Sequence, residues 1–580
     1  MSKQILDSVE MNTKEDFESF NIREKLKKAI KPYDYYKTID RLDFDNLTLS
    51  DMLLLQDFGI YNNELNDEEF MLRLRFPAGR ITNLELKTLG LICKKYELDI
   101  ILTARAGIQL HKLDSANILE VFKTLENIGI NTWQSFGDNI RNITTDIFDG
   151  RGKYNIINVY PYIVQMQKYI LKNEELLGLL PRRLSTTISG SYVNQASFFA
   201  SDIYFALAKK NKTYGFNLYL GGKNSELAQC ANIFLKENEV LEVFKIIVKV
   251  FNKHGLRLDR ERTRLFHLLE EIGIELFRTF LQEEYKKQFT TKGKTLLEKV
   301  SFSEYEQLKD GTFSFCYRSE FARLKADELL NISSYASKNN LEVRLGVDQQ
   351  IYLFNLKEKS ILLENYNRNR TVIACVGSEY CPYAYWNIKD EISFLPLEKI
   401  EEYNLLVGFS GCLKGCAKHE HSDIGLVGLK SNIYGRREKT ARIYLGALYT
   451  NGEKTAKRVF NTVPINSLKE ILTIIIDEFE NSGYRTFEDF ARSVLHKYSD
   501  EFLNLWFLAK YYTKKTVYLD TPNYKELLED NFINESFMDY ISKDSQEDFK
   551  KAIKFLSYSL WNKKESKKDA LLNKTYIMQG

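Results

Sequence analysis

The pattern of apolar and polar residues from Gly79 to Leu113 predicts a helix followed by two strands. Apolar residues first recur at helical spacing, and two short apolar runs then follow with a turn between them. The segment that begins at Ala322 has the same pattern and aligns with the first without a gap. Matching residues are Arg80 and Arg323, Glu85 and Glu328, Leu86 and Leu329, Lys95 and Lys338, Leu102 and Leu345, Ile108 and Ile351, and Leu113 and Leu356. Such a repeat constrains the architecture before any local prediction does.

A second repeated block follows the first in the same order. Residues 189–203, SGSYVNQASFFASDI, align without a gap with residues 410–424, SGCLKGCAKHEHSDI. The sequences YLGG at Tyr219 and YLGA at Tyr444 follow later in each copy. Short apolar repeats arise by chance in any α/β chain, but two ungapped blocks in one order do not. We therefore expect a long duplicated unit and an α+β fold with pseudo-two-fold symmetry.

Length and composition place the chain among large folded proteins. It has 580 residues, of which 44% are hydrophobic, with 37 Phe, 35 Tyr and only 8 Pro. This favours several domains and little disorder. The 82 basic and 79 acidic residues nearly balance, so no nucleic acid is expected as a partner. Any specificity for an anion must come from local clusters of charge.

The first twenty residues are charged throughout, without the apolar core and cleavage site of a secretory signal. No apolar run approaches the roughly 18 residues of a membrane helix. We therefore expect a soluble, cytoplasmic protein with no membrane partner. Cysteines in that reducing compartment suit metal ligation better than disulfides. The three isolated cysteines are expected to be buried and inert; they are Cys93, Cys230 and Cys316.

Four other cysteines form two close pairs about thirty residues apart. Five residues separate Cys375 from Cys381, and three separate Cys412 from Cys416. Four thiolates suit either zinc or an iron–sulfur cluster. Zinc knuckles usually have two intervening residues within a pair, so zinc is the minority interpretation. Glycines beside the thiols would let the backbone approach a bulky inorganic centre; they are Gly377, Gly411 and Gly415.

The first copy lacks these ligands. Ser191 and Gln195 stand at the positions of Cys412 and Cys416. Only the second copy can therefore bind a metal there. The first copy is left for another task.

The paired cysteines resemble the pattern of the sirohaem-dependent sulfite and nitrite reductases, and the resemblance extends from about Gly59 to Ser493. It implies that the four cysteines hold a [4Fe-4S] cluster. It also implies that Cys416 is the axial ligand of the sirohaem iron. A shared thiolate would let single electrons pass from cluster to haem without a long jump.

Two motifs resemble the segments of that family that face the substrate. In Arg73-Leu-Arg75-Phe-Pro-Ala-Gly79 the first arginine corresponds to a substrate ligand. In Gly137-Asp-Asn-Ile-Arg141-Asn the arginine corresponds to one on the distal side of the haem. Guanidinium groups suit a small oxyanion because they offer forked, charged donors. The resemblance thus assigns Arg73 and Arg141 to the catalytic site.

The segment Leu180-Pro-Arg182-Arg183-Leu-Ser185 resembles the family's L-P-R-K-x-K or L-P-R-K-x-N motif. Arg182 is implied to bind the cofactor, while Arg183 replaces the substrate-binding lysine and Ser185 the variable last residue. Arginine keeps the charge but does not readily release a proton, so Arg183 is expected to clamp the anion electrostatically. Ser185 removes a cation usual in the sulfite reductases and moves the site toward the plant-type nitrite reductases.

A strand pair is implied to lie along the macrocycle. Thr103-Ala-Arg105-Ala-Gly-Ile-Gln109-Leu-His111 resembles the family's T-x-R-x-x-x-Q-x-H motif, whose side chains bind sirohaem carboxylates. Arg105 and Gln109 are the main expected contacts, with Thr103 and His111 beside them. An arginine-rich segment resembles a further contact, made here by Arg262 and Arg264.

The resemblance implies ferredoxin-like half-domain repeats plus two larger α/β domains that bind the sirohaem. The expected segments are an N-terminal arm, 1–65; the first ferredoxin-like half, 66–148; the first sirohaem and substrate domain, 149–305; the second half, 306–370; the [4Fe-4S] and sirohaem domain, 371–497; and a C-terminal helical, Lys-rich appendage, 498–580. His419 and His421 follow Cys416 closely but are expected to form hydrogen bonds rather than metal bonds.

The implied activity is six-electron reduction of sulfite to sulfide, with reduction of nitrite to ammonium as the alternative. A remote alternative is a non-catalytic protein that senses metal or redox state, which would have no use for the full set of arginines. No G-x-G-x-x-G motif opens a recognisable βαβ unit and no room remains for a flavin module. The electron donor is therefore expected to be a separate ferredoxin or flavoprotein subunit.

Overall fold

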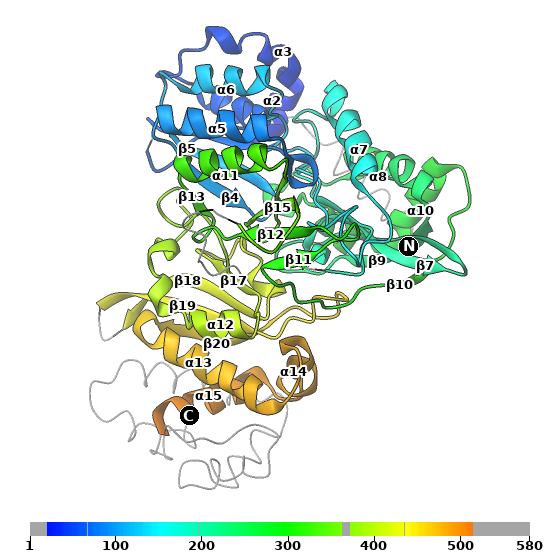
Figure 1. Cartoon of the computed structure of the whole chain (residues 1–580). Coiled ribbons are helices and arrows are strands. Elements are labelled where there is room, and N and C mark those ends of the chain that lie inside the picture. Colours follow the sequence, from blue (N-terminus) through cyan, green and yellow to red (C-terminus); the bar gives the residue numbers. More distant parts are fainter. Residues whose placement is uncertain are drawn as a thin grey trace. The chain divides into compact units, whose positions relative to one another are not determined.

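The structure is a computed structural model that describes residues 20–513, apart from 67, 195–196, 362, 364–371 and 434–435. The chain divides into two compact units. Unit 1 comprises residues 1–370 together with the short segment 450–453, and unit 2 comprises the rest. Figure 1 colours both along the sequence.

The described helices of unit 1 are α2 (Ile22–Ala29), α3 (Pro32–Tyr36), α4 (Leu49–Leu55), α5 (Asn83–Lys95), α6 (Ile118–Asn127), α7 (Tyr160–Lys172), α8 (Val240–His254), α9 (Leu265–Ile272), α10 (Ile274–Tyr285) and α11 (Ala326–Lys338). Its strands are β1 (Ile60–Asn62), β2 (Phe70–Leu74), β3 (Arg80–Ile81), β4 (Asp99–Thr103), β5 (Gly107–Leu113), β6 (Thr186–Ser189), β7 (Ile203–Lys210), β8 (Thr213–Leu220), β9 (Gln229–Leu235), β10 (Lys294–Thr295), β11 (Tyr305–Gln307), β12 (Phe313–Tyr317), β13 (Arg323–Leu324), β14 (Glu342–Leu345) and β15 (Ile351–Leu356).

Two five-stranded sheets of unit 1 exchange a short strand. One has the order β1-β2-β5-β4-β13 and the other β11-β12-β15-β14-β3. Arg323 and Leu324 of β13 pair with β4 of the first sheet, and Arg80 and Ile81 of β3 pair with β14 of the second. Each sheet is therefore completed by residues from the other segment of the chain.

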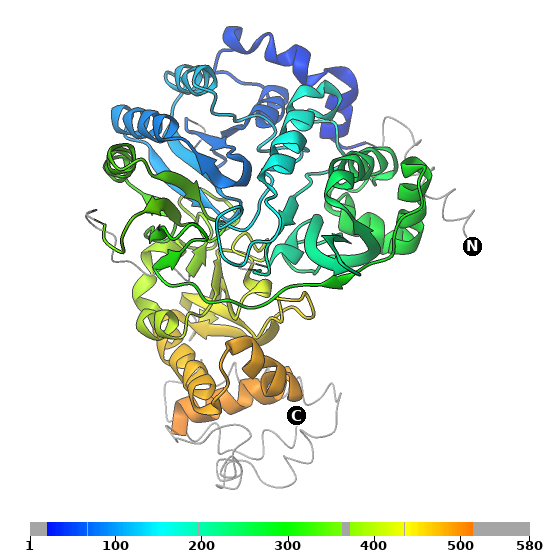
Figure 2. The same ribbon diagram turned by 45° about the vertical axis from the view of Figure 1, so that its right-hand side comes forward.

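Helices α5 and α11 lie side by side against these sheets, as Figures 1 and 2 show. Thr82 caps the start of α5 in a capping box with Glu85, which satisfies N–H groups that a helix end leaves unpaired. The buried faces have helical spacing; they are Leu86, Leu89, Ile92 and Cys93 in α5 and Leu329, Ile332 and Ala336 in α11. The predicted helix, strand, turn and strand of each segment are confirmed.

A third sheet in unit 1 has the order β10-β7-β8-β9, with β6 parallel to β7. Its core includes buried Ile203, Phe205 and Leu207 of β7. Helix α8 adds apolar residues at helical spacing, such as Val243 and Phe251. Helices α8, α9 and α10 follow β9 along the chain.

Unit 2 contains one described sheet of five strands. These are β16 (Val372–Ala374), β17 (Val407–Ser410), β18 (Ile424–Ile433), β19 (Arg436–Leu445) and β20 (Lys457–Pro464), paired in that order. The first two pairings are parallel and the others antiparallel. The helices are α12 (Leu397–Glu402), α13 (Ile465–Ser482), α14 (Phe487–Ser493) and α15 (Asp500–Thr513).

Helix α15 is held in unit 2 by buried polar contacts. The indole N–H of Trp506 and the ammonium of Lys510 both donate to Glu478 of α13, each at 2.7 Å. The lysines of the predicted C-terminal appendage, from Lys563 onward, lie outside the described residues. No helix within the described part of the chain is both long enough and apolar enough to span a bilayer.

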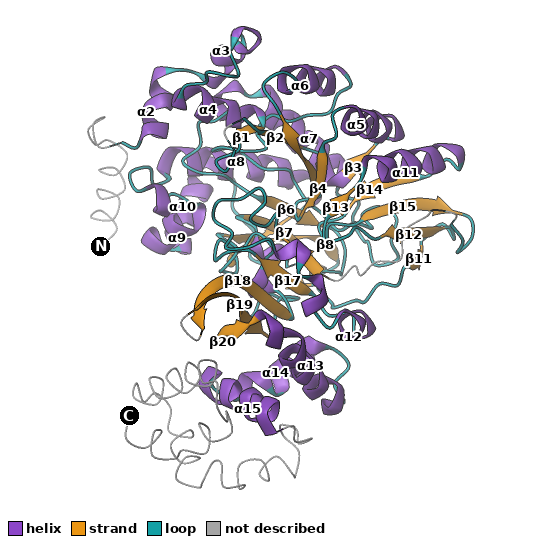
Figure 3. Ribbon diagram, turned by 90° about the vertical axis from the view of Figure 1, so that its left-hand side faces the viewer, coloured by secondary structure: helices purple, strands orange, loops and turns teal. Residues whose placement is uncertain are grey.

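Helices and sheets alternate along both units, as Figure 3 shows by colour, so the predicted mixed α+β class is confirmed. Cys93 and Cys316 are buried as expected. Cys230 is only partly buried because it lies on β9, where exposed and buried positions alternate, so its predicted burial is wrong. The domain boundaries stay a prediction.

Candidate active site

Arg73 and Gln109 lie opposite each other on neighbouring strands of unit 1. Arg73 of β2 pairs with Gln109 of β5 in the sheet register. With its amide oxygen turned toward this neighbour, Gln109 accepts a hydrogen bond from Arg73 Nε at 3.0 Å. The guanidinium carbon of Arg73 also stands 4.6 Å from the ring centre of Phe136, and that of Arg141 stands 5.6 Å from the same ring. Phe136 thus holds the two predicted substrate ligands in one neighbourhood.

Arg141 is only 5% exposed and its position is fixed by the backbone around it. Its Nη2 donates to the carbonyl of Gly137 at 2.8 Å. The fully buried Arg75 donates to the carbonyls of Ile140 at 2.7 Å and Arg141 at 3.0 Å. Arg141 Nε, by contrast, has no hydrogen-bond partner among the described residues. A buried donor left in this state suits a site that receives an acceptor from outside the chain.

Four guanidinium groups gather here. Burial lowers the pKa of Arg141 well below its usual range, and three neighbouring positive charges lower it further; they come from Arg183, Arg73 and Arg105. Mutual repulsion of this kind destabilises a folded protein unless an anion offsets it. The structure therefore brings together four of the predicted site residues in a cationic cluster that fits a negatively charged ligand.

Asp138 supplies the opposing charge from within the same motif as Arg141. Its carboxylate is fully buried, and Arg260 binds it with two hydrogen bonds of 2.6 and 2.7 Å. Lys27 lies 2.8 Å away and Arg182 lies 3.6 Å away. Burial alone raises the pKa of Asp138, but Lys27, Arg23 and Arg260 bring it well below its usual range. This carboxylate therefore stays ionised and anchors the loop that carries Arg141.

Ser185 and Arg264 share another buried carboxylate, that of Asp202. Ser185 donates to Asp202 Oδ2 through its hydroxyl at 2.6 Å and its backbone N–H at 2.8 Å. Arg264 donates to Asp202 Oδ1 at 2.6 Å. Both predicted residues thus have partners within the protein. Arg262 pairs instead with Glu270 at the surface.

Thr103 and Arg105 form the predicted turn between β4 and β5. The hydroxyl of Thr103 accepts a hydrogen bond from the N–H of Gly107 at 3.2 Å. Asn142 donates to the carbonyl of Arg105 at 2.9 Å and to that of Phe76 at 2.7 Å. Asn142 therefore connects the turn to the loop that carries Arg141, while His111 lies buried on β5.

In unit 2, parallel strands bring the first cysteine of each pair to one edge of the sheet. Cys375 directly follows β16, and Cys412 lies two residues beyond β17. Cys375 continues the ladder by donating its N–H to the carbonyl of Phe409 at 3.1 Å. Parallel strands end at the same edge, so their cysteines emerge together.

All four thiols are electrostatic neighbours. Burial, together with the charge of nearby Cys416, raises the pKa of Cys375 to about 12. The pKa values of Cys381 and Cys412 are also raised by burial first and by Cys416 next among the charges. Such thiols ionise when a metal centre binds them. The ammonium of Lys389 acts in the opposite direction on Cys375, which suits a bound thiolate.

Backbone N–H groups converge on Cys375. Its sulfur accepts from Gly411 at 3.0 Å and from Gly377 at 3.4 Å. A Cβ at Gly411 would lie 2.7 Å from the Cβ of Ala384 and 3.2 Å from the sulfur, so glycine is required for this approach. Four soft thiols with such donors fit a [4Fe-4S] cluster. In the described residues, no three His, Cys, Asp or Glu side chains are placed to hold a single metal ion.

His419 anchors the loop behind the cysteines. It is buried, and its Nδ1 lies 3.1 Å from Ser410 Oγ, which also accepts from the N–H of Ala417 at 3.2 Å. This hydrogen bond agrees with the role expected from the sequence.

Several residues of the site were missed by sequence reasoning. Asp138 was part of a quoted motif but was not singled out. Asp202 could have been found from the repeat, because Ser-Asp-Ile recurs at Asp423. Arg75 could have been noticed as the second arginine of its motif, whereas nothing in the sequence pointed to Phe136.

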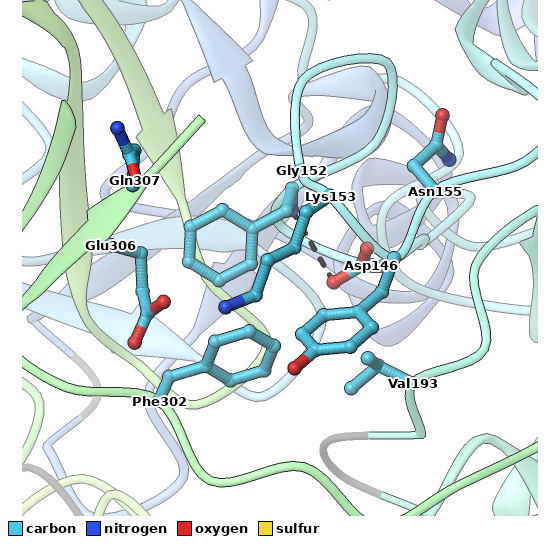
Figure 4. A pocket seen from close by; sticks show the side chains of 10 residues that line it. Asp146, Gly152, Lys153, Asn155, Val193, Phe302, Glu306 and Gln307 are labelled. Atoms are coloured by element: carbon cyan, nitrogen blue, oxygen red, sulfur yellow. Dashed lines mark hydrogen bonds between the residues drawn. The ribbon is translucent and has the colours of Figure 1, made fainter. Parts of the chain in front are cut away.

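A separate small pocket lies in unit 1. Its lining mixes charge and aromatic rings, as Figure 4 shows; the residues are Asp146, Phe148, Gly152, Lys153, Tyr154, Asn155, Val193, Phe302, Glu306 and Gln307. Asp146 accepts a hydrogen bond from Ser191 Oγ at 2.6 Å.

Two family descriptions of known proteins match segments of unit 1. The family description "Nitrite and sulphite reductase 4Fe-4S domain" matches residues 136–289, and "Nitrite/Sulfite reductase ferredoxin-like half domain" matches residues 63–128. The first match covers the loop of Arg141 and the segment of Arg183 and Ser185. The cysteines of unit 2 lie outside both matched ranges.

Similar proteins cover most of the chain. A ferredoxin–nitrite reductase of Synechococcus elongatus is 26% identical over 457 residues, which are 73% of this chain and 89% of that protein. The chloroplastic ferredoxin–nitrite reductase of Arabidopsis thaliana is 26% identical over 490 residues, 76% and 82% of the two chains. The NirA protein of Mycobacterium tuberculosis has a similar fold, with a TM-score of 0.75 at 21% identity over 83% of this chain and 97% of that one.

The fold, the grouped thiols and these matches define an iron–sulfur oxidoreductase. The chain carries two segments of the nitrite and sulfite reductase family, a ferredoxin-like half domain and a 4Fe-4S domain.

Proposed function

We propose that this protein catalyses the six-electron reduction of nitrite to ammonium, using sirohaem and a [4Fe-4S] cluster. The observation that carries the proposal is the cluster of Arg73, Arg105, Arg141 and Arg183, whose charges act together on Arg141. A cluster of this kind suits both an anionic substrate and a macrocycle that bears carboxylates.

We propose nitrite as the substrate rather than sulfite, which the sequence favoured, for two reasons. The relatives from Synechococcus elongatus and Arabidopsis thaliana are named as nitrite reductases. At the variable motif position, Ser185 offers no charge, and its hydroxyl is bound to Asp202. A singly charged anion requires fewer cations than the largely dianionic sulfite.

When bound, the sirohaem supplies an iron centre that accepts electrons one at a time and passes them to nitrite. Arg73, Arg141 and Arg183 bind the nitrite oxygens and stabilise negative charge as oxygen leaves as water. Arg183 keeps its proton throughout, since a guanidinium does not titrate readily. Protons must come from solvent or from other groups.

Other residues of unit 1 hold the macrocycle. The proposed contacts to its carboxylates are Thr103, Arg105, Gln109, Arg182 and Arg264. Arg182 forms an ion pair with Asp138, and Arg264 forms one with Asp202. Such pairing fixes each guanidinium in place before the cofactor arrives.

The thiols of unit 2 hold the cluster; they are Cys375, Cys381, Cys412 and Cys416. Cys416 is the exposed member of the set, which supports its additional role as the sirohaem ligand. By analogy with the named relatives, ferredoxin is the proposed donor.

The exchanged strands β3 and β13 support the proposed duplication and its pseudo-two-fold axis. We retain the segments 66–148 and 306–370 as the two ferredoxin-like halves, 149–305 and 371–497 as the two larger domains, and 1–65 and 498–580 as the flanking segments.

The decisive experiment is steady-state turnover of the purified, sirohaem-loaded protein with a chemical one-electron donor. We expect kcat/KM for nitrite to exceed that for sulfite by at least about tenfold. A preference for sulfite would show that the proposed substrate is wrong. Turnover of neither, with both cofactors present, would support a non-catalytic sensor.

Arg141→Ala should raise KM for nitrite by about 10- to 100-fold, because a charged hydrogen bond of about 1.5–3 kcal/mol is lost. The sirohaem absorption spectrum should persist. Arg278→Ala, which removes a partly exposed arginine of α10, is the control. An unchanged KM in Arg141→Ala would remove this residue from the site.

A further inference from the structure

Helix α2 makes charged contacts with two loops that carry the anion-binding arginines. It begins after Asn21, whose side chain caps the first turn by accepting from the N–H groups of Arg23 and Glu24. The residues that α2 buries are these two charged ones rather than apolar ones. A helix of eight residues is too short to be stable alone. Ionic contacts therefore hold it in place.

We infer that α2 is a positioning element for the anion site and that Lys27 and Arg23 are its positioning residues. This inference rests on the proposed function. Neither residue is expected to touch the substrate. Each acts through the loops that hold Arg141 and Arg183.

Lys27 joins the two loops directly. Its ammonium lies 2.8 Å from Asp138 Oδ2 and donates to the carbonyl of Leu180 at 2.6 Å. Asp138 precedes Arg141 by three residues, and Leu180 precedes Arg183 by three. One ammonium group thus ties together the backbones that present both arginines.

Arg23 strengthens the first of these attachments. Its Nη2 lies 3.1 Å from Asp57 Oδ1 and its Nε lies 3.4 Å from Asp138 Oδ2. Asn139, in the loop itself, donates to Asp57 Oδ1 at 2.7 Å. A Cβ at Gly137 would lie 2.4 Å from Arg23 Nη2, and the φ of Gly137 is +61°, so glycine suits the close approach of this loop to the helix.

Glu24 secures the second loop through an intermediary. It accepts from Arg257 Nη1 at 2.9 Å, and Arg257 Nη2 donates to the carbonyl of Leu179 at 3.3 Å. Side chains of α2 are therefore linked to both loops, directly at Asp138 and Leu180 and through Arg257 at Leu179.

The physical consequence concerns the buried Asp138. Lys27 is one of several cations around this fully buried carboxylate. Removing it weakens the attachment of Asp138 and frees the carbonyl of Leu180 at the same time. The two arginines then lose their fixed separation, and small displacements of binding groups cost much catalysis.

The test compares Lys27→Met with Lys28→Met, the same change at an exposed lysine of the same helix. Hydrogen–deuterium exchange should increase at least about threefold in segments 137–142 and 179–185 of Lys27→Met only. Its KM for nitrite should rise roughly tenfold with a smaller change in kcat. Lys27→Arg should restore both.

A double-mutant cycle separates positioning from a general loss of stability. In an Arg141→Ala background, Lys27→Met should raise KM by a clearly smaller factor than in the wild type, because one of the two arginines it positions is already absent. An equal effect in both backgrounds would overturn the inference. So would unchanged exchange in both loops, a result that stands whether or not the wild-type protein reduces nitrite. Wild-type turnover alone tests the proposed function.

Discussion

The cysteine site of unit 2 and the pocket of unit 1 are built on matching backbones. In unit 2, Ile373 pairs in parallel with Gly408 of β17, and Cys375 follows two residues later. In unit 1, Thr144 pairs in parallel with Thr187 of β6, and Asp146 follows two residues later. The sequence repeat equates β6 with β17. Asp146 therefore takes the place of Cys375.

Each of the two acidic groups accepts a hydrogen bond from the N–H group two residues further along the chain. The N–H of Gly377 reaches Cys375 Sγ at 3.4 Å, and that of Phe148, also two residues on, reaches Asp146 Oδ1 at 3.3 Å. Burial raises both pKa values, to about 12 for Cys375 and about 6 for Asp146. The same backbone thus presents a buried acid in each unit.

The side chains explain why only one unit suits a cluster. Ser191, at the position of Cys412, binds Asp146 directly. Gly152 stands where Cys381 would be, and a Cβ there would lie 2.6 Å from the Cβ of Phe148. Hydrogen bonds and aromatic packing close the space that thiols would need. The comparison teaches that a few side chains on matching strand pairs determine whether four thiols can gather there.

The arginine cluster, in contrast, lies in the first of the two copies. Arg73 pairs with Gln109 in the first sheet, and Cys316 pairs with Tyr352 in the second. Cys316 and Tyr352 belong to an apolar cluster with Phe148 and Phe354. One copy therefore carries the arginines and the other carries the paired thiols. At the matching positions, each copy has side chains that pack or form hydrogen bonds instead.

The largest effect should come from making the cysteine site more like the pocket. Cys375→Ser should abolish cluster binding and reduce turnover by about a thousandfold or more, because the fourth thiolate is lost. Iron and acid-labile sulfide analysis measures the first effect. Cys230→Ser, at a partly buried cysteine outside the site, should keep the cluster. Full iron content in Cys375→Ser would refute the ligand assignment.

An intermediate effect is expected at Asp146. Its folded-state pKa of about 6 exceeds the ordinary 3.8, so the folded protein holds this proton more tightly than the unfolded chain does. The resulting stabilisation is complete below about pH 4 and is lost as the pH rises through 6, a change of about 3 kcal/mol. Asp146→Asn should remove this part of the pH dependence.

Urea unfolding of wild type and Asp146→Asn at several pH values measures the difference. The cluster should remain bound in the variant, because Asp146 lies in the copy that lacks the four paired cysteines. Parallel stability curves for the two proteins would show that Asp146 titrates normally.

The smallest effect is expected for Ser185→Ala. The matching position in unit 2 is Leu406, whose N–H donates to Asp423 at 2.9 Å just as that of Ser185 donates to Asp202. The backbone bond should therefore survive, at a cost of about 1 kcal/mol for the lost hydroxyl bond. KM for nitrite should change less than about threefold. A tenfold change would place Ser185 in contact with the substrate.

The local parts of the fold and site could be predicted from the sequence. Helix periodicity gave α5 and α11, and the motifs gave Arg73 and Gln109, which meet across two strands. The exchange of β3 and β13 could not be predicted, because two-residue strands carry no pattern. The role of Asp138 was also hidden, since its partners Lys27 and Arg260 are remote in sequence.

The strand exchange has a consequence for synthesis on the ribosome. Strand β4 has no partner on one side until Arg323 and Leu324 have emerged, and β3 must wait for β14. An unpaired edge is a template for association with other chains. The nascent chain therefore carries exposed strand edges through most of the elongation of unit 1, and slow elongation or a premature stop there should favour aggregation over folding.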